Sequence, residues 1–362
     1  MTTSTRASAN KKQEGAAPPA SEAEPGSKHK VEEGAPPPEA KRAKKAPATE
    51  ENAEEAPKEE APKKEEKKAK TKTKTKTEPA SEEDRESPIL EKGIIYFFFR
   101  GRVNIDEPSD VSEIARSYII LRPIAKDGHL GSGTIGDAGN SRLCVIPKKV
   151  LPQTGKDRWI SFVEKTGATF QQLKEEFLAA NDYETKTAGT RHAPAATPVG
   201  EGVYAITNTG KDGHLAYILT LPEELGEVQK EIGLKEKGSF IISTRNPQYE
   251  PPKNAQLPKG PEYPEEVLDE FRSLRWIPTQ PKHLDYVNTQ FLLIGESSGV
   301  EKALEPQGDG QKEGKDDPVE ELEKLEEEDY ERMKGLSEDD AGRIFADLQV
   351  DAGEYPKLQT TF

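Results

Sequence analysis

Large hydrophobic side chains are missing from the first 87 residues of this 362-residue chain. Residues 1–87 contain no Phe, Tyr, Trp, Leu or Ile, and their 19 basic and 19 acidic residues leave no net charge. A segment with so little apolar surface cannot offset the conformational entropy that is lost on folding. We therefore predict a disordered, low-complexity tail with strong compositional bias over residues 1–87.

Cysteine and long apolar runs are also scarce. Cys144 is the single cysteine, so no disulfide can close within the chain, which is typical of a reducing compartment. The longest apolar run, from Ile94 to Phe99, has six residues, whereas a membrane helix needs about 20. The start of the sequence also lacks the apolar stretch of a secretory signal. We expect an intracellular protein that has no membrane partner.

The far end of the chain is acidic. Residues 301–362 carry 20 acidic and 8 basic residues, a net charge of −12. We predict that they are mostly disordered, apart from an amphipathic helix from Pro318 to Lys334 that Asp317 caps. The apolar residues after it lie among acids, which is typical of a segment that folds on a partner. We predict that such a partner-docking segment includes Ile344, Phe345, Leu348 and Tyr355. Docking back onto the chain's own core, and no specific role, are the alternatives.

A short basic motif lies in the first tail. It consists of Lys41, Arg42, Lys44 and Lys45, with prolines on both sides. An extended basic segment of this kind is typical of a nuclear import signal. We predict a nuclear protein. The alternative is a cytoplasmic protein in which the motif is a chance feature of a Lys-rich tail.

Residues 88–300 have the composition of one folded domain. Short apolar segments bounded by turn residues predict strands over 93–100, 117–122, 142–146, 158–164, 202–208, 214–221, 239–244 and 289–294. Helices are fewer and are predicted over 169–180, with Thr169 and Gln172 as a capping box, over 263–272 and near 109–114. Because strands and helices do not alternate regularly, we predict a β-rich α+β fold, a mixed or antiparallel sandwich or barrel. Two similar lobes are an alternative, since the strands from Gly93 and from Gly202 resemble each other.

Two glycine motifs look like functional ones but lack the required context. Gly131–Gly136 matches a dinucleotide-binding fingerprint, yet it neither follows a strand directly nor opens a helix. Gly295–Gly299 matches a nucleophile elbow, yet no histidine follows it in the chain. The histidines are dispersed and no paired-cysteine pattern exists. We predict no catalytic residues, no metal site and no cofactor.

The best candidate site is the segment 183–202, which we expect to be a long loop between a helix and a strand. Loops of this length in compact domains are usually functional or disordered. Lys186, Arg191 and His192 could bind a small anion together with the hydroxyl of Thr187. Glu201 and His214 would close the pocket. The alternative is that Arg191 and His192 only bond the loop's own carbonyl groups.

The core resembles a family of uncharacterised fungal proteins that are often labelled "BTB domain transcription factor". The resemblance rests on the runs 91–100, 185–192, 200–204, 226–229, 281–286, 345–348 and 355–356. The label implies nuclear regulation, but it implies no activity that can be assigned to residues of this chain. A BTB domain has several helices in an α/β arrangement, whereas this core is rich in strands.

These observations support three functional hypotheses. The first is a nuclear adaptor that binds other proteins, with a role in transcription or chromatin. The second is a small-anion or metabolite binder, or an enzyme, that uses the 183–202 segment. The third is a protein associated with nucleic acid, against which the nearly neutral core argues, because phosphate binding rests on clustered Lys and Arg. The oligomeric state stays open.

Overall fold

The computed structural model describes residues 88–187, 189–305 and 317–362. Nine strands of these residues form one sheet in which every pairing is antiparallel. They are β1 (Ile89–Gly101), β2 (Ile114–Pro123), β3 (Ser141–Ile146), β4 (Arg158–Ala168), β7 (Ala196–Asn208), β8 (Gly213–Leu221), β9 (Lys237–Arg245), β10 (Trp276–Pro278) and β11 (Gln290–Gly295).

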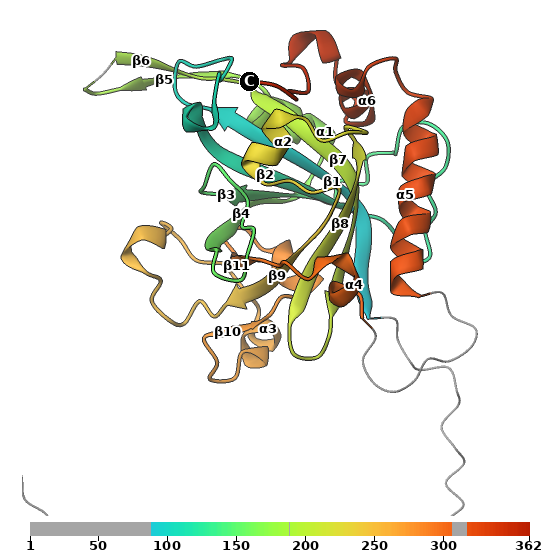
Figure 1. The fold of residues 1–362 in the computed structure, drawn as a ribbon. Helices are drawn as coiled ribbons and strands as arrows, with labels where there is room; N and C mark the ends of the chain where they lie inside the picture. The colour runs from blue at the N-terminus through green and yellow to red at the C-terminus, as the bar shows by residue number, and fades with distance from the viewer. Residues whose placement is uncertain (1–87, 188, 306–316) are drawn as a thin grey trace, which may run out of the picture. The chain divides into compact units, whose positions relative to one another are not determined.

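Eight of the nine strands close into a barrel. The sheet runs β9-β11-β4-β3-β2-β1-β7-β8, and β8 then pairs with β9 from Gly213↔Ile242 to Ile218↔Lys237. The short β10 extends beside the far end of β9. A closed sheet has no exposed edge strands, which are otherwise prone to non-native pairing (Figure 1). The predicted β-rich fold is confirmed, and of the two architectures predicted, sandwich or barrel, it is a barrel.

Both faces of the barrel wall are buried along β1, and this explains the unbroken apolar run of that strand. Ile95, Phe97 and Phe99 point into the lumen, where they pack with side chains of the other strands. The residues between them belong to a second apolar cluster on the outside of the wall. Aromatic rings fill the lumen, with 5.0 Å between the ring centres of Phe97 and Tyr217. A void of about 10 Å³ beside Cys144 has room for about one water molecule.

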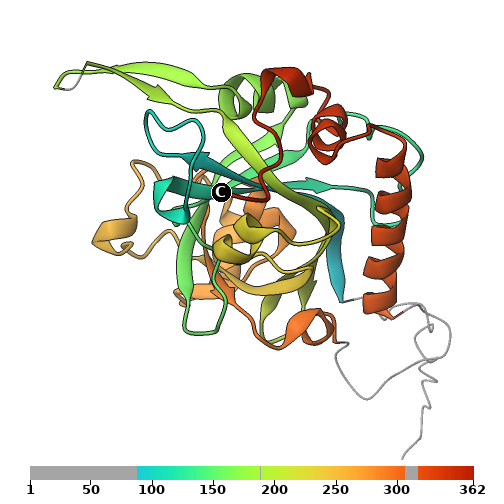
Figure 2. The ribbon, with the colours of Figure 1, turned by 45° about the horizontal axis from the view of Figure 1, so that its top comes forward.

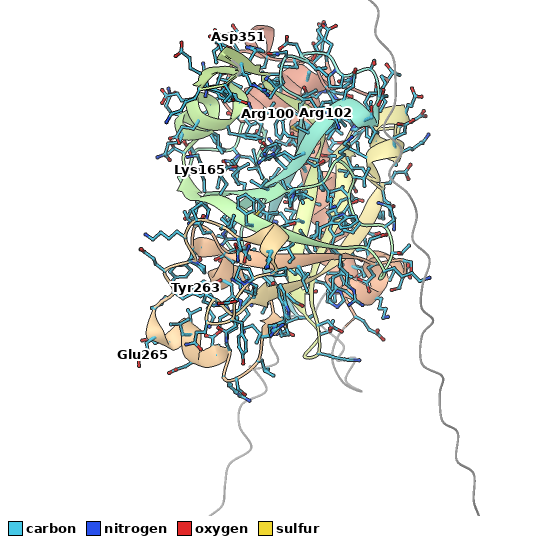
Figure 3. The ribbon with its side chains drawn as sticks, turned by 90° about the vertical axis from the view of Figure 1, so that its left-hand side faces the viewer. Arg100, Arg102, Lys165, Tyr263, Glu265 and Asp351 are labelled. Atoms are coloured by element: carbon cyan, nitrogen blue, oxygen red, sulfur yellow. The ribbon has the colours of Figure 1, made fainter. Side chains whose placement is uncertain are left out.

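Helices cover the outer face of the barrel on one side. They are α1 (Phe170–Leu173), which continues as one π turn (Lys174–Leu178), α5 (Pro318–Lys334) and α6 (Asp340–Asp347). Figure 1 shows α5 running along the wall with α6 above it. Three shorter helices, α2 (Glu227–Ile232), α3 (Glu265–Glu270) and α4 (Gly299–Ala303), lie at other places around the barrel. Figure 3 shows the α3 region, with Tyr263 and Glu265, at the end of the barrel opposite Arg100 and Arg102.

The acidic C-terminal region corrects one prediction. Residues 317–362 do not form a mostly disordered tail, because α5 and α6 pack on the barrel and complete its outer apolar cluster. The predicted partner-docking residues are part of this contact: Ile344, Phe345 and Leu348 are at most 1 % exposed, and Tyr355 stacks near Phe345. They contact the chain's own core, so docking back onto the core is the alternative observed; Ile344, Phe345 and Leu348 are buried there, and Tyr355 is partly buried.

Most of the other predicted elements are confirmed. All eight predicted strands exist, α5 begins and ends at the predicted residues, and Asp317 accepts a hydrogen bond from the Val319 amide at 3.0 Å. The capping box of Thr169 and Gln172 is also present. The predicted disordered tail and the basic import motif lie outside the described residues. Three strands were not predicted, β10 and the pair β5 (Asn181–Thr185) and β6 (Gly189–Ala193).

Candidate functional site: a projecting β-hairpin

The segment 183–202 is not the long loop that the sequence predicts. Its first half forms the hairpin β5–β6, and its second half is the beginning of β7. The hairpin, which we call the arm (residues 181–193), is a two-stranded sheet separate from the barrel sheet. Figures 1 and 2 both show it extending away from the body of the protein.

The structure does not bring the six predicted anion-site residues together. Lys186 and Thr187 lie in the turn at the tip of the arm, and Arg191 lies on the exposed face of β6. His192 sits at the root of the arm. Glu201 and His214 are buried in the barrel wall on β7 and β8, each with partners of its own. These six residues therefore do not line one shared pocket.

His192 fastens the arm to the body. Its Nδ1 lies 2.6 Å from a carboxylate oxygen of Asp182 on β5, and its Nε2 lies 2.9 Å from one of Asp106 in the loop after β1. The backbone of Asn104 adds a hydrogen bond from its amide to the His192 carbonyl at 2.8 Å. Hydrogen bonds to both carboxylates raise the pKa of the imidazole. A protonated ring can donate from both nitrogens, so this contact favours the charged form.

The two faces of the arm differ in chemistry. Tyr183 and Arg191 lie directly opposite each other on one face, and Tyr183 is 40 % exposed. The other face carries Asp182 and Glu184. The outer edge of β6 is bonded to Asn104 near the root, whereas among the described residues the outer edge of β5 pairs with no other strand. An isolated hairpin is marginally stable in water, and an open strand edge is a template for another strand.

His214 belongs to a different, buried group. Its Nδ1 lies 3.0 Å from a carboxylate oxygen of Glu296, the same oxygen that accepts a hydrogen bond from the Ser239 hydroxyl at 2.9 Å. The carboxylate therefore bridges the serine and the histidine. In a hydrolytic triad the histidine must bridge the other two, so this group has the wrong order for nucleophilic catalysis. The Gly295–Gly299 motif, which contains Glu296, connects β11 to α4.

Glu201 belongs to a buried charge network beneath α5 and α6. Arg332 of α5 bonds the carboxylates of Glu201 on β7, at 3.1 Å, of Asp329 on its own helix and of Asp347 on α6. Further bonds link this network to neighbouring elements: Arg122 of β2 and the hydroxyl of Tyr96 of β1 both contact Asp347, and the Thr220 hydroxyl of β8 contacts Asp329. The network joins both helices to four strands.

The network holds three carboxyl groups but only two guanidinium groups, and all five are at most 2 % exposed. Burial, and then the charges of Asp329 and Asp347, raise the pKa of Glu201 well above its usual range. Its Oε2 has no hydrogen-bond partner. A proton on Glu201 would make the network electrically neutral, which lowers the cost of burying these charges.

The glycine motif Gly131–Gly136 lies against this region and not at the start of a helix. A groove of about 590 Å³ separates it from α5, with Glu327, Glu328 and Glu331 on the helix side. The Ile135 amide donates to Asp347 at 3.1 Å, and the Gly136 carbonyl accepts from Arg122. The loop is therefore tied to the buried network, and Lys324 and Arg332 line the groove beside it together with the three glutamates.

The sequence reasoning missed Tyr183 and Asp182 as parts of the arm and Asp106 as its contact on the body, and it missed the buried network. A signal existed in both cases. Asp329 and Arg332 continue the helical spacing of the apolar residues Leu322 and Leu325, so charged residues occupy the buried face of α5. In the arm, alternating polar residues flank a turn that contains glycine, a weaker sign of a hairpin.

Among the described residues, no group of three His, Cys, Asp or Glu side chains is placed to hold a metal ion. None of the helices described is long and apolar enough to cross a membrane. The comparisons with known proteins add no identity: no family model matches this chain, and neither does any curated protein or solved structure.

Proposed function

We propose that this protein is an adaptor that binds a partner protein through the arm. The observation that carries the proposal is the outer edge of β5, which projects from the body with a half-exposed aromatic ring beside it. A partner segment in an extended conformation can add a third strand to such an edge, because its backbone supplies the missing hydrogen bonds. Within the described residues, the eight barrel strands are each paired on both sides, and outside the arm the three-residue β10 is the other strand with one unpaired side.

The side chains of β5 indicate what kind of strand would fit. Glu184 and Asp182 point to one face of the arm, and Tyr183 points to the other. Directly opposite residues in neighbouring strands interact favourably when they are oppositely charged or when both are aromatic or apolar. A partner strand in which basic residues alternate with an apolar residue would therefore complement residues 182–184.

Affinity capture of the tagged full-length protein from cells that express it tests this proposal. We expect the variant with Tyr183→Ala and Glu184→Ala to lose a partner that the wild-type protein retains after nuclease treatment. Leu274→Ala is a matched control, because Leu274 is even more exposed, at 54 %, and lies on the segment between β9 and β10. Equal capture by the arm variant and the wild-type protein would reject the proposal, and loss on nuclease treatment would favour a nucleic-acid bridge.

We also propose that the adaptor acts in the nucleus, in transcription or chromatin. The support for this comes from the sequence motif Lys41, Arg42, Lys44 and Lys45. A fluorescent fusion of the full chain is expected to accumulate in the nucleus, and replacement of these four residues by alanine is expected to abolish the accumulation. An unchanged distribution of the quadruple variant would contradict this part of the proposal.

A further inference from the structure

The last residues of the chain form an extended segment, which we call the strap (residues 356–362), near the place where β1 ends and β7 begins. The strap contacts three parts of the body, which are the start of β7, the start of α2 and the loop after β1. Its backbone is bonded on both sides: the Gln359 amide donates to the Pro198 carbonyl at 3.2 Å, and the Val228 amide donates to the Thr360 carbonyl at 3.1 Å. Figure 2 shows this end of the chain, marked C, lying over the body of the protein.

The surface beneath the strap is shaped to fit a polypeptide backbone. Gly226 has no side chain where the strap passes: a Cβ atom there would lie 2.3 Å from the Thr360 carbonyl oxygen, far inside contact distance. Gln229 is fully buried, and its Nε2 donates to the carbonyls of Val199 and Gln359, each at 2.9 Å. At the two ends, Leu358 and Phe362 pack against the outer and the lumenal apolar clusters.

The strap does not satisfy every polar atom of the surface beneath it. The Oε1 atom of Gln229 is buried and accepts no hydrogen bond from the residues that the structure describes. Its orientation is fixed, because both hydrogens of the Nε2 group are used by carbonyl oxygens and a flipped amide would lose both bonds. A Cβ atom at Gly226 would lie 2.9 Å from this oxygen, so it faces the place where Thr360 passes. A buried acceptor without a donor destabilises the bound arrangement.

We propose that the strap occupies a peptide-binding groove, and that the groove can take an extended segment of another protein in its place. The groove selects for an apolar residue at the position of Leu358, an aromatic residue at that of Phe362, and a side chain with an N–H donor at that of Thr360. Such a donor would reach Gln229 Oε1 and supply the hydrogen bond that this oxygen lacks when the strap is in place. The strap then acts as a built-in competitor, displaced by a segment that fits better.

This groove is a second surface, and the proposal does not depend on the arm. The two are neighbours, however, through the loop after β1. Asp106 and Asn104 of that loop bind His192 at the root of the arm, and the Pro108 carbonyl accepts a hydrogen bond from the Gln359 side chain at 3.0 Å. One partner with two short segments could therefore engage both.

Fluorescence anisotropy with a labelled peptide of residues 353–362 tests the proposal on the full-length chain. Phe362→Ala loosens the strap in the protein and should allow the peptide to bind. The wild-type chain should bind it at least about tenfold more weakly, since a tethered competitor acts at an effective concentration near the millimolar range. A peptide with Thr360→Asn should bind about fivefold more tightly, and one with Thr360→Val should bind like the parent.

Gly226→Ala, added to Phe362→Ala, is the control that closes the groove. The φ angle of Gly226 is −75°, which alanine adopts readily, so the added methyl group obstructs only the strap and the groove. We expect this double variant to bind no peptide. Melting curves verify that each protein is folded, and Leu358→Ala replaces Phe362→Ala if the latter is not. The proposal is overturned if a folded, loosened variant binds no peptide or if Gly226→Ala leaves binding unchanged.

Discussion

Two hairpins follow each other in this chain, and only Pro194 and Ala195 separate them. In β7–β8 almost every residue is buried, and both outer edges are paired, with β1 and β9. In β5–β6 most residues are exposed, and the outer edge of β5 pairs with no strand among the described residues. The comparison indicates which part of the protein supports the fold and which part is available for binding.

The largest expected difference comes from one tyrosine in each hairpin. Tyr217 of β8 is packed between Phe97 and Phe240 in the lumen, whereas Tyr183 of β5 is 40 % exposed. We expect Tyr217→Ala to lower the free energy of unfolding by about 4 kcal/mol, through lost packing and a residual cavity. Tyr183→Ala should change it by less than about 0.5 kcal/mol. Urea unfolding measures both, and similar losses for the two variants would remove the distinction.

The barrel hairpin is also held from outside, through Glu201. Arg332→Ala leaves the buried carboxylates of Glu201, Asp329 and Asp347 without their shared partner and should cost about 3 kcal/mol. Lys334→Ala is the control on the same helix, because this exposed side chain contacts only surface partners, Glu331 and the ring of Tyr330, and should matter little. If the two variants unfold at the same urea concentration, the network does not hold α5 on the barrel.

The pH dependence of stability sharpens the contrast between the two hairpins. The pKa of Glu201 is raised in the folded state, above about 4.3 in the unfolded chain. Its stabilising contribution is therefore complete at low pH and is lost as the pH rises through the folded pKa, with a slope of up to about 1.4 kcal/mol per pH unit. Glu201→Gln should remove this slope. Parallel pH profiles for the variant and the wild-type protein would show that Glu201 carries no proton in the fold.

The arm has a weaker, local pH dependence. Asp182 and Asp106 raise the pKa of His192 in the folded protein, so the contact at the root is strongest below pH 6 and is lost as the pH rises through the folded pKa. Hydrogen exchange of the arm amides should accelerate over that range, beyond the intrinsic effect of pH. Asp106→Asn should shift the transition to lower pH while the barrel amides stay protected. If neither the rise in pH nor Asp106→Asn alters the exchange protection of the arm amides, His192 does not hold the arm.

Sequence reasoning succeeded for the longer elements that apolar residues marked, whereas it missed the three-residue β10. The strands of the barrel and the helix Pro318–Lys334 were predictable because their buried residues recur at the strand or helix period. The arm was not predictable in this way, because no face of β5 or β6 is apolar. The helical spacing of Asp329 and Arg332 shows that both lie on the buried face of α5, but it does not reveal their partners, because the contact between Glu201 and Arg332 spans 131 positions. The many acidic residues of 317–362 suggested disorder. The docking of their apolar neighbours on the barrel is again a contact between distant parts of the chain, which the sequence does not reveal.

The most direct test of the account is photo-crosslinking in cells from two positions of the full-length protein. A photoreactive phenylalanine analogue replaces Tyr183 on the arm in one variant and Leu274 in the other, both of which are exposed. We predict one dominant protein adduct from position 183, resistant to nuclease and absent from position 274. The same adducts from both positions, or none from position 183, would contradict the claim that the arm binds a partner.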